Sequence, residues 1–177
     1  GTTLTGGSWK ALTGATLSIE STVGNGGSIV TNAADITLSG AGSVLCVRNP
    51  VGGALTSLET SLTSNTAAGA LRILGGRTFT TAGAFSNAGI LEVGGVGGSS
   101  TFATGGGALG TFTQQAGSTL NVEIAGVASF GRVQAAGQAT LAGTLNVTAP
   151  GFRPPVGSLF QIVTYANSPG HGDFGTT

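Results

Sequence analysis

Apolar and polar residues alternate along most of the chain in short segments. The stretch at 131–148 reads GRVQAAGQATLAGTLNVT, and similar runs of period two occur at 16–21 (TLSIES), 35–39 (DITLS), 70–74 (ALRIL) and 119–124 (TLNVEI). Glycine, asparagine or serine separates one run from the next. Since successive side chains of a β-strand point to opposite faces, this pattern predicts a series of short strands joined by turns. The sequence therefore indicates an all-β fold.

An imperfect internal repeat suggests how these strands are arranged. Phe85, Phe112 and Val133 each begin the same template of an apolar residue, several small or polar residues, a glycine and an alternating strand. Two short strands with their turns in roughly 20 residues are typical of one coil of a β-solenoid. We therefore predict a single-stranded right-handed parallel β-helix of roughly eight coils. A β-sandwich remains the structural alternative, because it also consists of short strands at regular spacing.

The chain is predicted to form one solenoid with an interruption. Residues 1–126 are assigned to solenoid coils, and residues 127–177 to C-terminal coils or a cap of the same solenoid. Within the first range, residues 53–66 leave the repeat: Leu55, Leu58 and Leu62 are spaced as on one face of a helix, in a segment rich in serine and threonine. This segment is expected to be a short helix or a loop.

The composition argues against some classes of binding partner. Charged residues make up 7% of the chain and balance to a net charge of zero, whereas about 25% is usual for soluble domains. Such a surface lacks the basic patches that bind nucleic acid or anionic membranes, and no apolar run is long enough to span a bilayer. We predict no nucleic-acid partner and no membrane insertion. The single cysteine, Cys46, has apolar neighbours and is expected to be a buried small hydrophobe.

Few residues of the sequence are candidates for catalysis or for metal binding. Glu92 in Leu-Glu-Val and Glu123 in Val-Glu-Ile occupy what looks like the same place in successive repeats, so stacking of coils would bring two carboxylates together. Paired carboxylates suit glycoside cleavage or calcium binding, while separate solvated carboxylates are the alternative. The single histidine, His171, lies between glycines in a loop and does not predict a catalytic triad. We expect no enzymatic activity and no cofactor.

Two aromatic residues are candidates for contact with sugar rings. These are Trp9 and Tyr165, the only residues of their types in the chain. For Trp9, covering the open end of the apolar interior is the alternative, because the end of a stacked repeat must be capped. The candidate ligand-binding residues are therefore Trp9, Tyr165, Glu92 and Glu123.

The C-terminal third resembles a known family. An aromatic-x-Arg-Val strand is followed by a Gly-x-Ala-Thr-Leu-x-Gly-Thr-Leu-x-Val strand pair, a Gly-Phe-x-Pro turn, a Gly-x-x-Phe-x-Ile-Val strand and Gly-Asp-Phe; these motifs lie at 130–133, 137–147, 151–154, 157–163 and 172–174. From Thr119 onward the chain resembles autotransporter-type passenger β-helices and the autotransporter-associated β-strand repeat proteins. It departs from a complete autotransporter in having neither a signal peptide nor a membrane barrel, and we expect it to be a fragment of a longer protein.

The resemblance implies an exported protein, extracellular or at the bacterial cell surface. The expected function is that of a non-enzymatic structural segment, acting as a stalk, spacer or adhesion scaffold. The alternative is a module that binds carbohydrate or associates with another copy through the open ends of the solenoid, where unpaired strand edges favour association. The expected partners are then a glycan, a host or cell-surface molecule, or a second copy of the chain.

Overall fold

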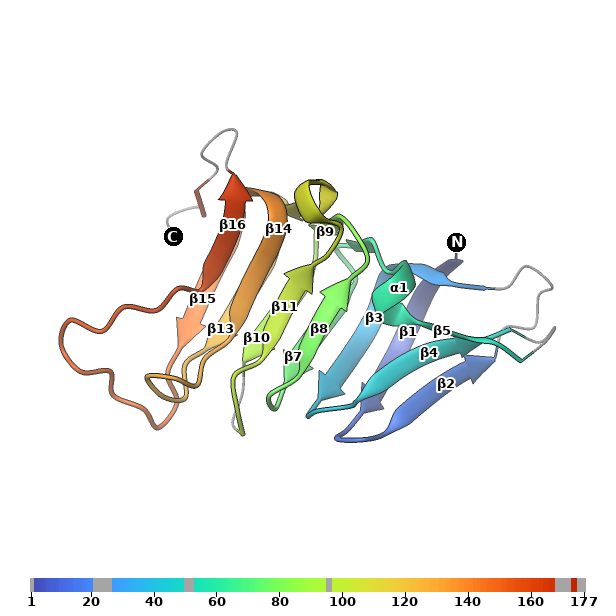
Figure 1. The fold of residues 1–177 in the computed structure, drawn as a ribbon, viewed down its shortest axis with the longest axis horizontal. Coiled ribbons are helices and arrows are strands. Elements are labelled where there is room, and N and C mark those ends of the chain that lie inside the picture. The colour runs from blue at the N-terminus through green and yellow to red at the C-terminus, as the bar shows by residue number, and fades with distance from the viewer. Residues whose placement is uncertain (1, 21–26, 50–52, 95–96, 168–172, 175–177) are drawn as a thin grey trace.

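The fold is a parallel β-solenoid (Figure 1). The computed structural model describes residues 2–20, 27–49, 53–94, 97–167 and 173–174. Within these ranges nearly every strand pairs in parallel with the strands one coil before and after it. Among the described residues, antiparallel pairing is limited to β4 (Val44–Arg48) with β5 (Leu55–Ser57) and to one bridge between Ile124 and Phe130. The predicted parallel β-helix is confirmed, and the β-sandwich, which requires antiparallel sheets, is wrong.

Each regular coil has three faces. Face 1 has six strands, in the order β1 (Thr2–Ala11), β3 (Ile29–Ser39), β7 (Ala70–Leu74), β10 (Ile90–Gly94), β13 (Thr119–Glu123) and β15 (Thr144–Thr148). Face 2 contains β6 (Ser64–Asn65), β9 (Phe85–Asn87) and β12 (Phe112–Gln114), between the first half of β3 and the last residues of β14 (Arg132–Thr140). Face 3 contains β8 (Thr78–Thr81), β11 (Thr101–Thr104), the first half of β14, and β16 (Val163–Asn167).

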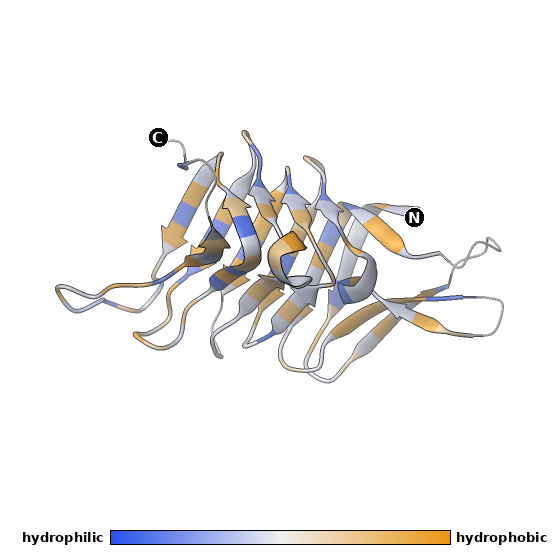
Figure 2. Ribbon diagram, turned by 45° about the horizontal axis from the view of Figure 1, so that its top comes forward, coloured by the Kyte–Doolittle hydropathy of each residue, from blue (hydrophilic) through white to orange (hydrophobic). Residues whose placement is uncertain are grey.

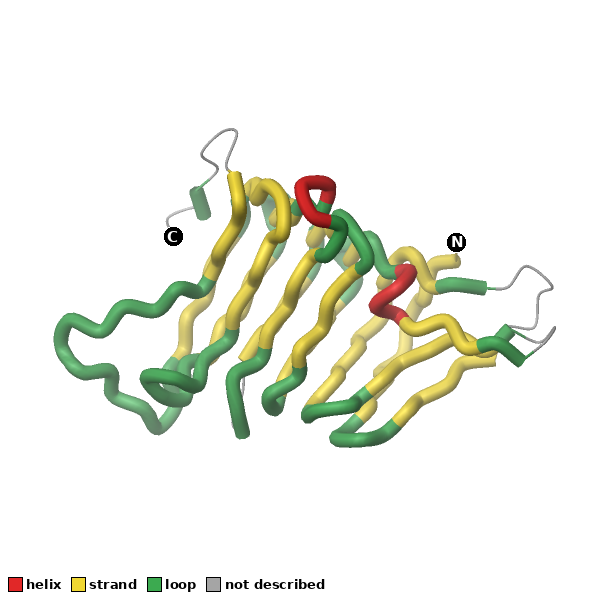
Figure 3. The backbone as a smooth tube through the Cα atoms, in the orientation of Figure 1, coloured by secondary structure: helices red, strands yellow, loops and turns green. Residues whose placement is uncertain are grey.

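The described strands of face 1 therefore stack six deep, fewer than the eight coils predicted. One interior row consists of Trp9, Ile36, Leu71, Leu91, Leu120 and Leu145. The stretch of chain from Ile36 to Leu71 is nearly twice as long as that from Leu71 to Leu91, whereas the prediction assumed coils of equal length. The longer coil includes β4 (Val44–Arg48), β5 (Leu55–Ser57) and a helical turn, which lie outside the three faces, and the strands of the faces keep their register although the coils differ in length (Figure 3).

The repeat was correctly predicted for two of its three copies. Phe85 pairs with Phe112, as the template requires. Val133 instead pairs with Phe102 on face 3, and the residue that follows Phe112 in its row is Ala139, as far beyond Phe112 as Phe112 is beyond Phe85. The third copy was misplaced because Gly137 resembles the corner glycine of the template, whereas β14 continues through Gly137 and the chain turns at Gly143.

Residues 53–66 contain a single helical turn between strands. Helix α1 (Leu58–Ser61) buries Leu58, and Leu62 directly after it is also buried, whereas Leu55 is half exposed. The helix contacts both β4 and β8, and β2 (Thr16–Glu20), β4 and β5 form a separate small sheet beside it (Figure 1). Arg77 joins these parts, because its guanidinium bonds Glu59 of α1 at 2.8 Å and the carbonyl of Ser43 at 2.9 Å.

The interior is apolar and closely packed. Hydropathy alternates along the strands (Figure 2), and the inward residues of the middle coils are almost fully buried. Phe102 lies against Phe79, Phe85 and Phe112, with ring centroids 5.7, 4.7 and 6.0 Å apart. Burial of such side chains contributes about 2–3 kcal/mol each, so the phenylalanine cluster is a main source of stability.

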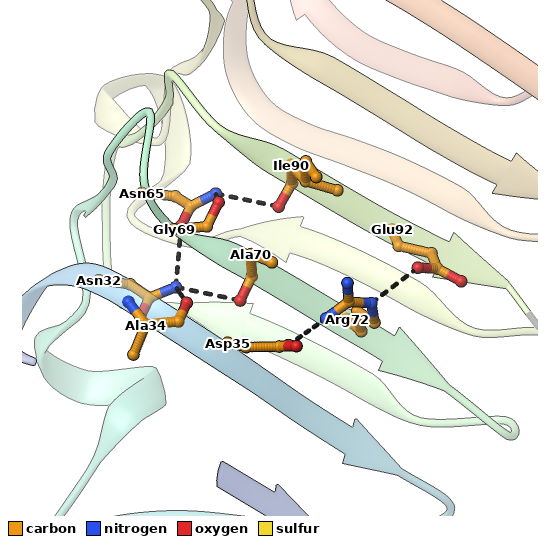
Figure 4. A network of polar contacts seen from close by, with 9 residues as sticks. All are labelled: Asn32, Ala34, Asp35, Asn65, Gly69, Ala70, Arg72, Ile90 and Glu92. Atoms are coloured by element: carbon orange, nitrogen blue, oxygen red, sulfur yellow. Dashed lines mark hydrogen bonds and ion pairs between the residues drawn. The ribbon is translucent and has the colours of Figure 1, made fainter. Parts of the chain in front are cut away.

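A ladder of buried amides runs through the interior at the corner between faces 1 and 2. The Nδ2 atom of Asn32 donates to Oδ1 of Asn65 at 2.8 Å (Figure 4). Asn65 in turn donates to Asn87 at 2.7 Å, and Asn87 donates to Oε1 of Gln114 at 3.0 Å. The amides also bond backbone groups where the chain turns, such as the carbonyls of Ala70 and Ile90. The ladder therefore satisfies backbone groups that a fully apolar interior would leave unpaired.

The corner beneath the ladder leaves room only for glycine at one position. A Cβ atom added at Gly89 would collide with the carbonyl oxygens of Thr66 and Gly69. Those carbonyls cannot easily move, because that of Gly69 accepts a hydrogen bond from the amide of Ile90 and that of Thr66 accepts one from the amide of Gly69. Gly89 thus permits the close approach of successive coils.

Candidate functional site

Three charged residues of face 1, Asp35, Arg72 and Glu92, form a cluster on its outer surface. Arg72 pairs with Asp35, and its Nε lies 3.0 Å from Oε2 of Glu92 (Figure 4). The three side chains are between a quarter and half exposed, so the Coulomb attraction between them is partly screened by solvent. The guanidinium already has two carboxylate partners, which leaves this cluster little capacity to bind a further anion.

A shallow hollow lies beside this cluster at the C-terminal end of face 1. It has a volume of about 560 Å³ and is lined by Glu92, Asn121, Leu145, Asn146, Val147 and Thr148. Asn146 donates to Asn121 at 3.1 Å, and both belong to the outward row that contains Glu92. The hollow offers one carboxylate and two amides, but the carboxylate is already engaged by Arg72.

The predicted equivalence of Glu92 and Glu123 is wrong. Leu91 pairs with Leu120 and Val93 with Val122, which places Glu92 opposite Asn121. Glu123 lies next to Gly94, further along the same pair of strands, and its Oε1 atom is buried without a hydrogen-bond partner among the described residues. The two glutamates were aligned by their apolar neighbours, but those neighbours occupy different rows. The structure therefore does not place two carboxylates directly opposite each other here.

Trp9 and Tyr165 occupy interior rows at opposite ends of the described solenoid. Trp9 pairs with Ile36, is half-buried against the core, and donates its indole N–H to the carbonyl of Gly6 at 3.0 Å. Tyr165 pairs with Ala135 and is 43% exposed. Trp9 thus covers one end of the apolar interior, as the alternative for it held, whereas Tyr165 is exposed on the last described strand of face 3. The two side chains are too far apart along the stack to form one site. Their contact with sugar stays a prediction.

A second groove, which the sequence did not reveal, lies on face 3. It has a volume of about 580 Å³ and is lined by Val127, Ala128, Phe130, Arg132, Gln134, Leu159, Gln161 and Thr164. Its floor comes from β14 and β16, and its sides from the loop before β14 and the long loop that leads from β15 to β16 (Figure 3). The guanidinium carbon of Arg132 lies 4.2 Å from the centre of the Phe130 ring, a cation–π geometry.

Arg132 differs from the other half-buried arginines in its surroundings. Arg72 and Arg77 have carboxylate partners, whereas no ion pair of Arg132 occurs among the described residues. Its Nε atom is buried and has no hydrogen-bond acceptor in the described part of the chain. The groove therefore contains a partly desolvated cation without an anion, which is energetically unfavourable.

Other candidate chemistry is sparse in the parts of the chain that the structure describes. No three metal-ligating side chains of His, Cys, Asp or Glu gather there. Cys46 is buried, as predicted, and His171 lies outside the described residues. No helix in these ranges is long and apolar enough to cross a membrane.

Comparison with known proteins identified no relative of this chain. The chain matched no family model, no curated protein and no solved structure. The resemblance to autotransporter passengers thus stays a prediction drawn from the C-terminal motifs.

Proposed function

We propose that the chain is a non-enzymatic structural segment of an exported bacterial protein, in which it acts as a stalk or spacer. The observation that carries this proposal is the continuity of the interior. The row from Trp9 to Leu145 holds one register through six layers, although the coils differ in length. Because each layer is hydrogen-bonded to the next, such a stack keeps its two ends at a fixed distance along its axis.

The buried amide ladder supports the same function. Three side-chain hydrogen bonds of 2.7–3.0 Å link four successive layers in addition to the backbone bonds of the sheets. A shift of one layer relative to the next would break these bonds and leave buried amides unsatisfied. The ladder thus resists bending and slipping, which a spacer requires.

The outer surface also suits a spacer. The charge cluster of Arg72, Asp35 and Glu92 is internally paired. The other charged residues of face 1 are Lys10 and Glu123, and its remaining outward positions are neutral, as at Thr37 and Asn121. A surface of low charge is compatible with exposure to changing salt outside the cell. The C-terminal motifs favour display at the bacterial surface or release from it.

The rigidity of the segment can be measured by spin labels at its two ends. Ser8 and Thr144 lie on the same outward row of face 1, five strand steps apart. In a Cys46→Ala background, labels at Ser8→Cys and Thr144→Cys are expected to give one narrow distance distribution centred at about 24 Å, since each step adds about 4.8 Å. A broad or multiple distribution would contradict a spacer.

A second experiment tests the role of the segment in its parent protein. If the segment acts through its length, its exchange for an unrelated β-solenoid of the same number of layers retains the function of the parent protein on the cell. Deletion of the segment abolishes that function. Loss of function after the exchange would show instead that the segment acts through its own surface. Antibody labelling of intact cells, compared with lysed cells, tests the proposed display.

A further inference from the structure

We propose that the groove around Arg132 binds the carboxylate group of an acidic sugar, such as a uronic acid within a polysaccharide. This proposal does not rest on the role of the chain as a spacer, since it concerns a local surface of face 3. The groove lies where the loop before β14 and the loop after β15 flank the two last strands of this face. Its volume of about 580 Å³ is in the range of small-molecule sites.

The single charged residue in the groove indicates which chemical group of a ligand binds there. Arg132 is the only ionisable residue among those that line it. The Phe130 ring covers one face of the guanidinium, and no anionic partner of Arg132 occurs among the described residues. A carboxylate has the planar geometry that pairs with one guanidinium through two parallel hydrogen bonds. Binding of a carboxylate would therefore compensate the desolvated charge.

The remaining polar residues of the groove are neutral and suit hydroxyl groups. Gln134 and Gln161 are exposed, Thr164 is half-buried, and their amides and hydroxyl both donate and accept hydrogen bonds. Val127 and Leu159, which are 63% and 94% exposed, supply apolar surface at the rim for the C–H groups of a sugar ring. One cation among neutral partners matches a singly charged sugar better than a phosphate ester, for which several cationic groups are usual.

Calorimetric titration of the chain tests this proposal. The probe is an oligomer of galacturonic acid, and the neutral probe is the galactose oligomer of the same length. We expect saturable binding of the acidic oligomer only. The change Arg132→Gln is expected to weaken binding at least tenfold, and Gln134→Ala about threefold to tenfold, since a hydrogen bond contributes about 0.5–1.5 kcal/mol.

Arg153→Gln is the matched control, because Arg153 is exposed in the neighbouring loop and does not line the groove. It removes the same charge and should leave the affinity unchanged, which separates the groove from general electrostatic attraction. Circular dichroism checks that each variant is folded. Gln134 is exposed on β14, so its replacement tests the groove even if the Arg132 variant does not fold.

The outcomes are distinct. Absence of binding, equal binding of the neutral oligomer, or equal loss in the Arg153 and Arg132 variants would overturn the proposal. Competition by inorganic sulfate as strong as by galacturonate would show a general anion site and would also overturn it. None of these results bears on the distance between labels at Ser8 and Thr144, so the spacer and the sugar site can fail separately.

Discussion

Replacing Asn65 by alanine removes the central member of the buried amide ladder. Asn65 accepts one hydrogen bond from Asn32 and donates to Asn87 at 2.7 Å, to Ile90 at 3.0 Å and to Gly69 at 3.2 Å. Each bond contributes about 0.5–1.5 kcal/mol net. The neighbouring amides keep some partners, because Asn32 still donates to backbone carbonyls and Asn87 still accepts from Gly89. We therefore expect a loss of about 3 kcal/mol in the free energy of unfolding.

Urea denaturation followed by circular dichroism measures this loss. The matched control is Asn121→Ala, because Asn121 also forms an amide–amide bond between layers, with Asn146 at 3.1 Å, but on the exposed surface. There water replaces the lost partner, so we expect a change below about 0.5 kcal/mol. Equal effects of the two changes would refute the reasoning, since they would show that burial of the ladder adds nothing to its stability.

Three further changes test other parts of the fold. Gly89→Ala should destabilise the protein by more than about 2 kcal/mol because its Cβ collides with backbone, whereas Gly83→Ala, which has open space, should change the free energy of unfolding by less than about 1 kcal/mol; thermal melts compare the two. Arg72→Met should lower the free energy of unfolding by about 1 kcal/mol at low salt and by less at high salt. An effect independent of salt in denaturation curves would show that the ion pairs do not contribute to stability. Phe102→Ala should cost about 3–5 kcal/mol in urea titrations, because Phe102 is fully buried in the centre of the phenylalanine cluster, and a loss below about 1 kcal/mol would show that the cluster is not tightly packed.

The strand alternation and the internal repeat together predicted the parallel solenoid, and the inward residues of each strand, such as Leu91 and Val93, are indeed the apolar ones. The number of coils was not predictable in the same way. It depends on how many residues separate one layer from the next, and the stretch from Ile36 to Leu71 contains β4, β5 and α1, which are not part of the three faces. The predicted position of Val133 was wrong for another reason: Gly137 resembles the corner glycine of the repeat, and a local motif does not specify the face of the solenoid on which it lies.

The amide ladder had a signal in the sequence that was not used. Asn87 and Gln114 stand two positions after Phe85 and Phe112, where the alternation predicts an inward side chain. A polar residue at an inward position in two copies indicates a buried polar row. The Arg132 groove had no such signal, because it forms only when the loop before β16 lies beside β14, and this proximity is a property of the folded chain.

The unequal coil lengths have a consequence for protein engineering. The layer that begins at Ile36 is much longer than the one that begins at Leu71, yet paired strands keep their register, so the corners accept inserted residues without disturbing the sheets. The loop around Val156, which is fully exposed, is one natural site of this kind. Guest peptides placed at corresponding corners of consecutive layers would be presented as a linear array with a period of about 4.8 Å, the spacing of the strands that carry them.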